Sequence, residues 1–528
     1  MNGKVIIEGK KINFSDVLNV AKNNYPITLS DNAIRLINKA TSIIEKWVKS
    51  GKVVYGMTTG VGDNIRILIP PRLAKELSEN IIISHAAGVG KPLPTEVVRG
   101  MMLIRINTLA EGKSGVALPT IRLLTEMLNR HIHPVVPEQG SVGASGDLAP
   151  LSHIAITLIG EGLVEYKGKI DKTINVFRKL GLKPVSLTYK EGLALINGTT
   201  GMTAIAALLI PECELLLKIA QAITAISLEV LYASIEPFNK KGHLLKPHPG
   251  QLAIASNLSL LLSGSRLIKH VEQITSILEK ELSDEIKSSD VHRQEAYSLR
   301  CIPQILGPVW DILQFVKNTV YIELNAIDDN PLILSENEVF HGGNFHGQPI
   351  AMAMDYLAIA LTEIGVLSER RTARLLDRTL NHDLPPFLAS GEPGLNYGYQ
   401  GAQYVATSLV AENRYLATPV STQSISTNAQ FQDVVSMGMI AARRTKQIFE
   451  NTIQILTLEL MCAVQAAEFR QAEKLSPASK TLYDVVREVL PKLQGDRVIS
   501  YDFEKVRNKV YTDECLRKIE TTIKHRLK

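Results

Sequence analysis

The chain has 528 residues, of which 45% are hydrophobic, which is enough for one large or two ordinary domains with a deep core and excludes a small stapled scaffold. Its 58 Lys and Arg residues against 53 Asp and Glu residues give a net charge of +5 that is spread along the chain, so we expect neither a nucleic-acid nor a membrane partner. The four cysteines lie far apart without C-x-x-C spacing, which favours reduced thiols, a cytoplasmic location and no metal site.

The first 200 residues are expected to form an α+β domain. Charged residues interrupt the N-terminus where an export signal would need an apolar core. Ser15 is placed as the N-cap of the first helix, and Gly51 is a stop signal for the second. Hydrophobic spacing predicts helices over 30–49, 73–85 and 95–111 and strand-bearing segments over 4–8, 158–170 and 185–187.

Residues 201–475 are expected to form a bundle of long helices, followed by shorter, more charged helices over 476–528. The predicted long segments are 250–283, 304–325, 349–380, 398–417 and 434–470. Helices of this length bury more apolar surface when they pair with other subunits, so we expect an oligomer. The longest charge-free stretch, residues 192–211, is broken at Asn197 to Gly201 and does not read as a membrane span.

The loop from Gly140 to His153 carries the tripeptide Ala144-Ser145-Gly146. Three glycines in its first seven residues allow backbone conformations that other residues avoid, and one of these would bring the Gly146 nitrogen onto the Ala144 carbonyl carbon. Ring closure with loss of water, including the Ser145 hydroxyl, would give a methylidene-imidazolone. That group is a carbon electrophile, which no ordinary side chain supplies and which suits elimination of an amine. We expect a helix after Leu148 whose N-terminus is capped by Asp147 or a neighbour.

Seven motifs, in family order and spacing, resemble the histidine and aromatic amino-acid ammonia-lyase family. They are Tyr55 to Gly60, Gly140 to His153, Ile196 to Thr199, Ala296 to Arg300, Asn325 to Pro331, Gly342 to His346 and Gln432 to Gly438. The resemblance implies a mainly α-helical fold with a central bundle, a methylidene-imidazolone formed from Ala144-Ser145-Gly146 with no external cofactor, and usually a homotetramer in which several subunits line each site.

Elimination of ammonia from an amino acid requires a base, an electrophile and an anchor for the carboxylate. We expect Tyr55 to be the base, with a pKa below the ordinary value of about 10 because amides surround it. Arg300 would hold the carboxylate as a two-pronged donor, and Tyr297 and Asn197 would complete the hydrogen bonds. The spacing puts Tyr297 and Arg300 one helical turn apart.

Three further residues are expected near the substrate. Gln294, three residues before Tyr297, is placed on the same helical face. Asn330 belongs to a loop, because Pro331 keeps it out of a helix, and supports the site. Phe345 resembles the family position that stacks near the substrate.

Four residues bear on which amino acid is the substrate. Ser84 and His85 resemble a pair found in histidine lyases, but the tyrosine aminomutase branch resembles it too, and a histidine can hydrogen-bond a phenol. Gln432 replaces the glutamate typical of histidine lyases and favours a neutral aromatic ring over an imidazolium. Phe431 adds apolar bulk to the pocket.

The sequence therefore predicts an ammonia-lyase that converts tyrosine or phenylalanine to an aryl acrylate, with 2,3-aminomutase activity as an open second outcome. Histidine ammonia-lyase, which gives urocanate, is the first alternative. A catalytically silent helical assembly protein is the second. The sequence leaves open whether the electrophile bonds the amine or the aromatic ring.

Overall fold

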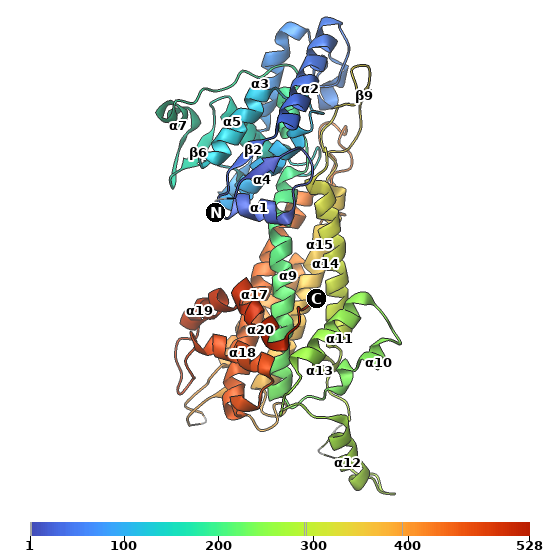
Figure 1. Cartoon of the computed structure of the whole chain (residues 1–528), viewed down its shortest axis with the longest axis vertical. Coiled ribbons are helices and arrows are strands. Elements are labelled where there is room, and N and C mark those ends of the chain that lie inside the picture. The colour runs from blue at the N-terminus through green and yellow to red at the C-terminus, as the bar shows by residue number, and fades with distance from the viewer. Residues whose placement is uncertain (1–2, 290, 292, 393) are drawn as a thin grey trace. The chain divides into compact units, whose positions relative to one another are not determined.

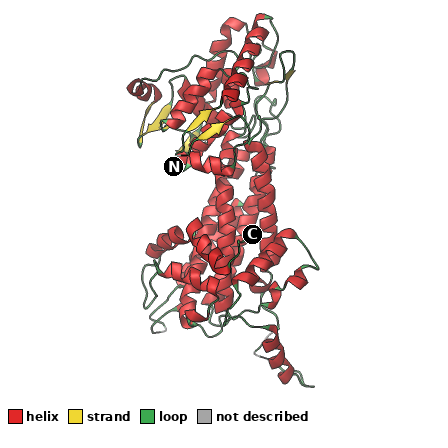
Figure 2. Ribbon diagram, viewed as in Figure 1, coloured by secondary structure: helices red, strands yellow, loops and turns green. Residues whose placement is uncertain are grey.

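The computed structural model describes residues 3–289, 291, 293–392 and 394–528. It consists mainly of helices, with a few short strands, as Figures 1 and 2 show. The prediction of a mainly α-helical fold is confirmed.

The chain forms two compact units that do not follow chain order. Unit 1 comprises Met1–Pro211, Val316–Asp355 and Pro419–Lys446, and unit 2 comprises Glu212–Phe315, Tyr356–Thr418 and Gln447–Lys528. This division differs from the expected boundaries at 200 and 475, because 316–355 and 419–446 belong with the N-terminal residues. Four of the five crossings fall inside long helices: α9 (Thr200–Val230), α14 (Ile302–Leu324), α15 (Gln348–Leu376) and α17 (Gly438–Phe469). The fifth lies between Thr418 and Pro419, outside any helix.

Unit 1 contains the shorter helices of the N-terminal half. These are α1 (Phe14–Ala21), α2 (Asp31–Lys49), α3 (Ala74–His85), α4 (Thr95–Ala110), α5 (Leu118–Asn129), α6 (Leu148–Leu158), α7 (Thr173–Leu180) and α8 (Glu191–Ile196). Ser30 caps α2 through its hydroxyl, at the start of the helix predicted over 30–49. The predicted cap of α1 is wrong: Asn13 and Asp16 form a reciprocal capping box there, and Ser15 lies inside the helix.

The strands of unit 1 are short and pair locally. β1 (Val5–Ile7) runs parallel to β2 (Ile27–Leu29), β3 (Val89–Pro92) pairs antiparallel with β5 (Pro137–Gln139), and β6 (Leu163–Tyr166) lies between β4 (Ile132–Pro134) and β7 (Lys169–Lys172). β8 (Leu332–Ile333) and β9 (Val339–Phe340) form a hairpin. The expected strand at 185–187 is absent, because only the Val185 amide joins another segment, at the Leu158 carbonyl.

Unit 2 is helical. Besides its share of the long helices it contains α10 (Lys240–His243), α11 (Pro249–Leu261), α12 (Val271–Glu281), α13 (Tyr297–Arg300), α16 (Gln400–Leu416), α18 (Pro477–Arg487), α19 (Ser500–Val510) and α20 (Asp513–Ile523). The predicted 250–283 segment is therefore two helices. In the core, Arg371 on α15 donates two hydrogen bonds to Glu459 on α17, at 2.5 and 2.9 Å.

Helices α15 and α17 are long and apolar enough to cross a membrane by length and composition. In their most apolar windows, 72% and 83% of the residues are buried within the chain. Such burial is typical of core helices.

Candidate active site

The loop that carries Ala144, Ser145 and Gly146 is held on both sides by backbone hydrogen bonds from distant segments. The Gly198 amide donates to the Ser145 carbonyl at 3.1 Å, and the Asp147 amide donates to the Gly198 carbonyl at 2.7 Å. On the other side, the Met437 amide donates to the Val142 carbonyl at 3.0 Å. The tripeptide is therefore fixed by residues some 50 and 290 positions further along the chain.

Gly146 fits the tight turn that ring closure requires. Its φ of +70° is a region that favours glycine, and a Cβ at this position would lie 2.0 Å from the Gly198 carbonyl oxygen. Bridge contacts pair Gly146 with Ala144 and with Gly143. The chain thus folds back on itself at Ser145, as a loop that closes between residues 144 and 146 must do.

Asp147 plays a different part from the one that its position predicted. It precedes α6 as the N-cap residue, but its side chain makes no capping hydrogen bond to that helix. Instead its fully buried carboxylate accepts from the Met202 amide in the first turn of α9, at 2.8 Å, and from the Ser141 hydroxyl, at 2.9 Å. Burial raises the pKa of Asp147 to about 6, against these hydrogen bonds.

Two cavities of unit 1 meet at this loop, and both are lined by Ala144 and Gln432. The first, of about 820 Å³, has an apolar wall with Ile81, Leu77 and Leu148 beside Ser84 and His85. The second, of about 910 Å³, contains most of the predicted site: Tyr55, Ser145, Asn197, Asn330, Phe345 and Phe431. The structure therefore brings these predicted residues together around the tripeptide.

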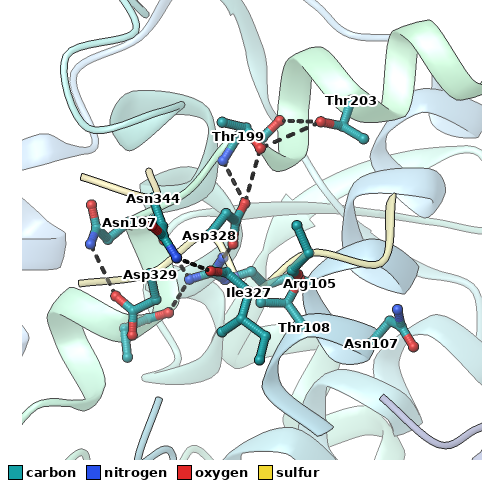
Figure 3. Close-up of polar contacts among 12 residues, drawn as sticks. Arg105, Asn107, Thr108, Asn197, Thr199, Thr203, Ile327, Asp328, Asp329 and Asn344 are labelled. Atoms are coloured by element: carbon teal, nitrogen blue, oxygen red, sulfur yellow. Dashed lines mark hydrogen bonds and ion pairs between the residues drawn. The ribbon is translucent and has the colours of Figure 1, made fainter. Parts of the chain in front are cut away.

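Asn197 is oriented by a buried acidic network, which Figure 3 shows. Its Nδ2 donates to Asp329 Oδ1 at 3.0 Å and to the Asn330 carbonyl at 3.1 Å. Lys190 pairs with the other oxygen of Asp329, and both side chains are buried. Since both neighbours of Nδ2 only accept, the amide orientation is fixed and Oδ1 is the group left for a ligand. Because Oδ1 is an acceptor, it suits the ammonium group of an amino-acid ligand and not the carboxylate group.

Arg105 forms the floor of this network (Figure 3). It is fully buried, pairs with Asp328 at 3.0 Å and donates to the Asn197 carbonyl at 2.7 Å. Asp328 in turn accepts from the Thr199 amide at 2.6 Å. The Arg105–Asp328 pair thereby holds the backbone on both sides of Gly198, the residue that is hydrogen-bonded to the tripeptide loop.

Tyr55 lies in the second cavity, but its acidity differs from the prediction. The Gly62 amide donates to its hydroxyl at 2.9 Å, and the backbone amide of Tyr55 donates to His341 Nε2 at 3.4 Å. Burial raises the pKa of Tyr55, and the Gly62 amide offsets only part of that rise. The expectation of a lowered pKa is wrong for the chain alone, because one amide does not outweigh desolvation.

His85 is positioned through its Nδ1, which lies 2.8 Å from the Ile81 carbonyl and 3.1 Å from Ser84 Oγ. Because the carbonyl can only accept, a hydrogen bond to it requires a proton on Nδ1. In a neutral ring Nε2 is then an acceptor, on a side chain that lines the first cavity. Ser84 Oγ donates to the same carbonyl at 3.1 Å.

Gln432 touches the tripeptide directly. Its Nε2 donates to Ser145 Oγ at 3.3 Å, and its Oε1 accepts from the Thr427 hydroxyl at 3.0 Å. Phe431, which is 48% exposed, lines the second cavity together with half-buried Phe345.

The predicted carboxylate clamp lies in unit 2, outside both cavities. Tyr297 and Arg300 are one turn apart in α13, as predicted, with the guanidinium 4.7 Å from the ring centre. Tyr297 is 68% exposed, and Arg300 Nε donates to the Glu295 carbonyl at 2.8 Å. Gln294 precedes the first residue of α13, so its expected place on that helical face is wrong.

Two residues near the tripeptide were not predicted. His341 precedes the Gly342 to His346 motif, and its contact to Tyr55 could have been suspected from that position alone. Thr427 belongs to no recognisable motif, and it meets Gln432 only because the intervening residues form a turn that the sequence does not indicate. No group of three His, Cys, Asp or Glu side chains placed to hold a metal occurs among the described residues.

Comparison with known proteins identifies the family. Residues 12–488 match the family described as "Aromatic amino acid lyase". The chain belongs to this family. Aromatic amino acid lyase relatives include a histidine ammonia-lyase of Alkaliphilus oremlandii, 43% identical over 98% of this chain and 99% of the relative, and an MIO-dependent tyrosine 2,3-aminomutase of Streptomyces globisporus, 42% identical over 99% and 98%. A solved tyrosine aminomutase from Streptomyces globisporus matches all of both chains with a TM-score of 0.95 and 41% identity.

The chain is therefore an enzyme of the ammonia-lyase and aminomutase family. The names of its relatives give histidine and tyrosine as substrates, and one name describes dependence on MIO, the abbreviation of methylidene-imidazolone. The relatives named here include both histidine and tyrosine enzymes at similar identity, so they leave the substrate open.

Proposed function

We propose that this aromatic amino acid lyase eliminates ammonia from tyrosine or phenylalanine to give an aryl acrylate. The observation that carries the proposal is the position of His85, whose Nδ1 lies 2.8 Å from the Ile81 carbonyl and whose ring lines the first cavity beside an apolar wall and the tripeptide, so that Nε2 of the neutral ring is an acceptor. A phenol hydroxyl can donate to that nitrogen, and an unsubstituted phenyl ring packs on Ile81 and Leu77. Gln432 offers no charge to an imidazolium.

Ala144, Ser145 and Gly146 are proposed to form the methylidene-imidazolone, which supplies a carbon electrophile for the elimination. The positive φ of Gly146 and its close approach to Gly198 support this origin. The Gly198 amide, which donates to the Ser145 carbonyl, holds a positive dipole against an oxygen that gains electron density when a nucleophile adds.

The remaining roles follow from what each side chain can offer. Tyr55, as phenolate, accepts the β-proton. Asn197 accepts from the substrate ammonium through Oδ1 and, with Asn330 and Phe345, confines the substrate in the second cavity. We propose a homotetramer in which Tyr297 and Arg300 of another copy bind the carboxylate, supported by the exposure of Tyr297 and by the family resemblance. The four free cysteines support a cytoplasmic location.

The test is to incubate the purified protein with tyrosine, phenylalanine and histidine and to follow the conjugated acrylate that each would yield. We expect coumarate or cinnamate; fast urocanate with neither of them would contradict the proposal. A β-amino acid product would assign the aminomutase outcome. His85→Phe should lower kcat/KM for tyrosine at least tenfold relative to phenylalanine, because the acceptor is lost.

Histidine ammonia-lyase is a second candidate, because an imidazole N–H could also donate to His85 Nε2 and a relative of that name is 43% identical. A silent assembly protein is the third. Intact mass separates it from both enzymes, since ring formation removes two waters, about 36 Da. Ser145→Ala should abolish turnover and restore the unmodified mass.

A further inference from the structure

A strained turn, residues 427–432, presents Gln432 to the tripeptide. Thr427 and Gln432 pair through their backbones, with N–O distances of 3.0 and 3.3 Å. Between them, Asn428, Ala429 and Gln430 have φ values of 52°, 50° and 67°. Three consecutive non-glycine residues in the left-handed region persist only where the surroundings fix them. The turn is therefore a defined scaffold for its two ends.

The side chains at the two ends are also joined. The Thr427 hydroxyl donates to Gln432 Oε1 at 3.0 Å, which leaves Nε2 directed at Ser145 Oγ, 3.3 Å away. Thr427 lines the first cavity, and Gln432 lines both cavities. The NH2 group of Gln432 thus faces Ser145, while its carbonyl oxygen is bound to Thr427 and points away from the tripeptide.

Ring formation joins Gly146 N to the Ala144 carbonyl carbon and releases two waters, which carry away the Ala144 oxygen and the Ser145 hydroxyl. The loss of that hydroxyl removes the acceptor of Gln432 Nε2. The N–H dipole then directs its positive end at the ligand. The negative face of a neutral aromatic ring tolerates such a donor, whereas an imidazolium is repelled by it.

We propose that Thr427 is a positioning residue that sets the ligand preference of the site by fixing the orientation of the Gln432 amide. This inference rests on the proposed function, since it assumes that an aromatic amino acid occupies the two cavities. Without the Thr427 hydroxyl, the amide can turn and offer its carbonyl, which accepts from an imidazolium.

The test measures binding rather than turnover. In the full-length Ser145→Ala protein, which lacks both the electrophile and the serine hydroxyl, calorimetry gives the affinities for L-tyrosine and L-histidine at a pH about one unit below 6.5, where the imidazole is charged. Thr427→Val should lower the tyrosine-to-histidine affinity ratio about three- to tenfold, the effect of one hydrogen bond. Thr427→Ser, which keeps the hydroxyl, should retain the ratio.

A second pair of variants excludes a general packing effect. In a Gln432→Leu background, Thr427→Val should leave the ratio unchanged, because the amide through which Thr427 acts is absent. An equal shift with and without Gln432, or the same ratio in Thr427→Val and Thr427→Ser, would overturn the proposal. If Thr427→Val melts well below its parent, Thr427→Ala replaces it with less bulk at the same site.

The two proposals fail in different ways. If L-tyrosine, L-histidine and also L-phenylalanine all fail to bind any of these proteins, the proposed function is wrong. If both tyrosine and histidine bind and substitution of Thr427 leaves their affinity ratio unchanged, only the positioning role is wrong.

Discussion

Tyr55 is expected to titrate above pH 10, so the rate of elimination should climb through the alkaline range. Burial raises the pKa of its phenol, and the only described hydrogen bond to the hydroxyl comes from the Gly62 amide, at 2.9 Å. A phenol with a pKa of 10 or more is less than about 1% ionised at pH 8, and this fraction rises tenfold per pH unit. Between pH 7 and 9, kcat should therefore rise about 100-fold.

Two measurements check this expectation. The first is kcat against pH at saturating substrate, which reports groups in the enzyme–substrate complex and not the free amine of the substrate. The second is an NMR titration of protein labelled at the tyrosine ring carbon, with Tyr55→Phe identifying the resonance. A Tyr55 resonance that titrates below about pH 9 would contradict a pKa raised by burial. A cation or further donors from outside this chain would then face the phenol.

Three other predictions concern buried groups. Gly146→Ala should leave the intact mass at its unmodified value, because the new Cβ meets the Gly198 carbonyl oxygen at 2.0 Å; the loss of two waters in this variant would contradict the turn geometry. Lys190→Met should lower the free energy of unfolding by about 3–5 kcal/mol, since it leaves Asp329 buried without its cation, as urea unfolding at fixed protein concentration would measure. Burial raises the pKa of Glu229 to about 7, so its folded form holds a proton that the unfolded chain releases above its ordinary pKa near 4.5. Stability should fall as pH rises through this window, by up to about 3 kcal/mol, and Glu229→Gln should remove that slope in unfolding curves at pH 5 and 8.

The local elements of the fold were predictable where one physical signal dominated. Helix α2 begins after Ser30 and ends just before Gly51 because an N-cap hydroxyl and a flexible stop residue bound an apolar stripe. The cap of α1 was missed because Asn13 and Asp16 satisfy each other, which a single Ser15 cannot match. The grouping of 316–355 and 419–446 with the N-terminal residues was not readable, since hydrophobic periodicity says nothing about which helix segments share a core.

The candidate site was predictable as a set of residues but not as an arrangement. Motifs named Tyr55, Asn197 and Gln432, and the structure gathers all three around the tripeptide. Their electrostatic state was not predictable. The acidity of Tyr55 depends on burial, and the free face of Asn197 depends on Asp329, 132 residues away. Both are consequences of tertiary packing.

The choice of ligand is controlled by hydrogen bonds behind the surfaces that the ligand touches. The Ile81 carbonyl accepts a hydrogen bond from His85 Nδ1, so Nε2 of the neutral ring is an acceptor. The Thr427 hydroxyl donates to Gln432 Oε1, so the NH2 end of that amide faces the tripeptide. Neither Ile81 nor Thr427 is itself an obvious ligand-binding residue. Each nevertheless determines whether the atom that a neighbouring side chain turns to the ligand donates or accepts a hydrogen bond. A substitution of His85 or Gln432 therefore removes a side chain that meets the ligand. A substitution of Thr427 keeps Gln432 in place and changes only which end of its amide faces the ligand.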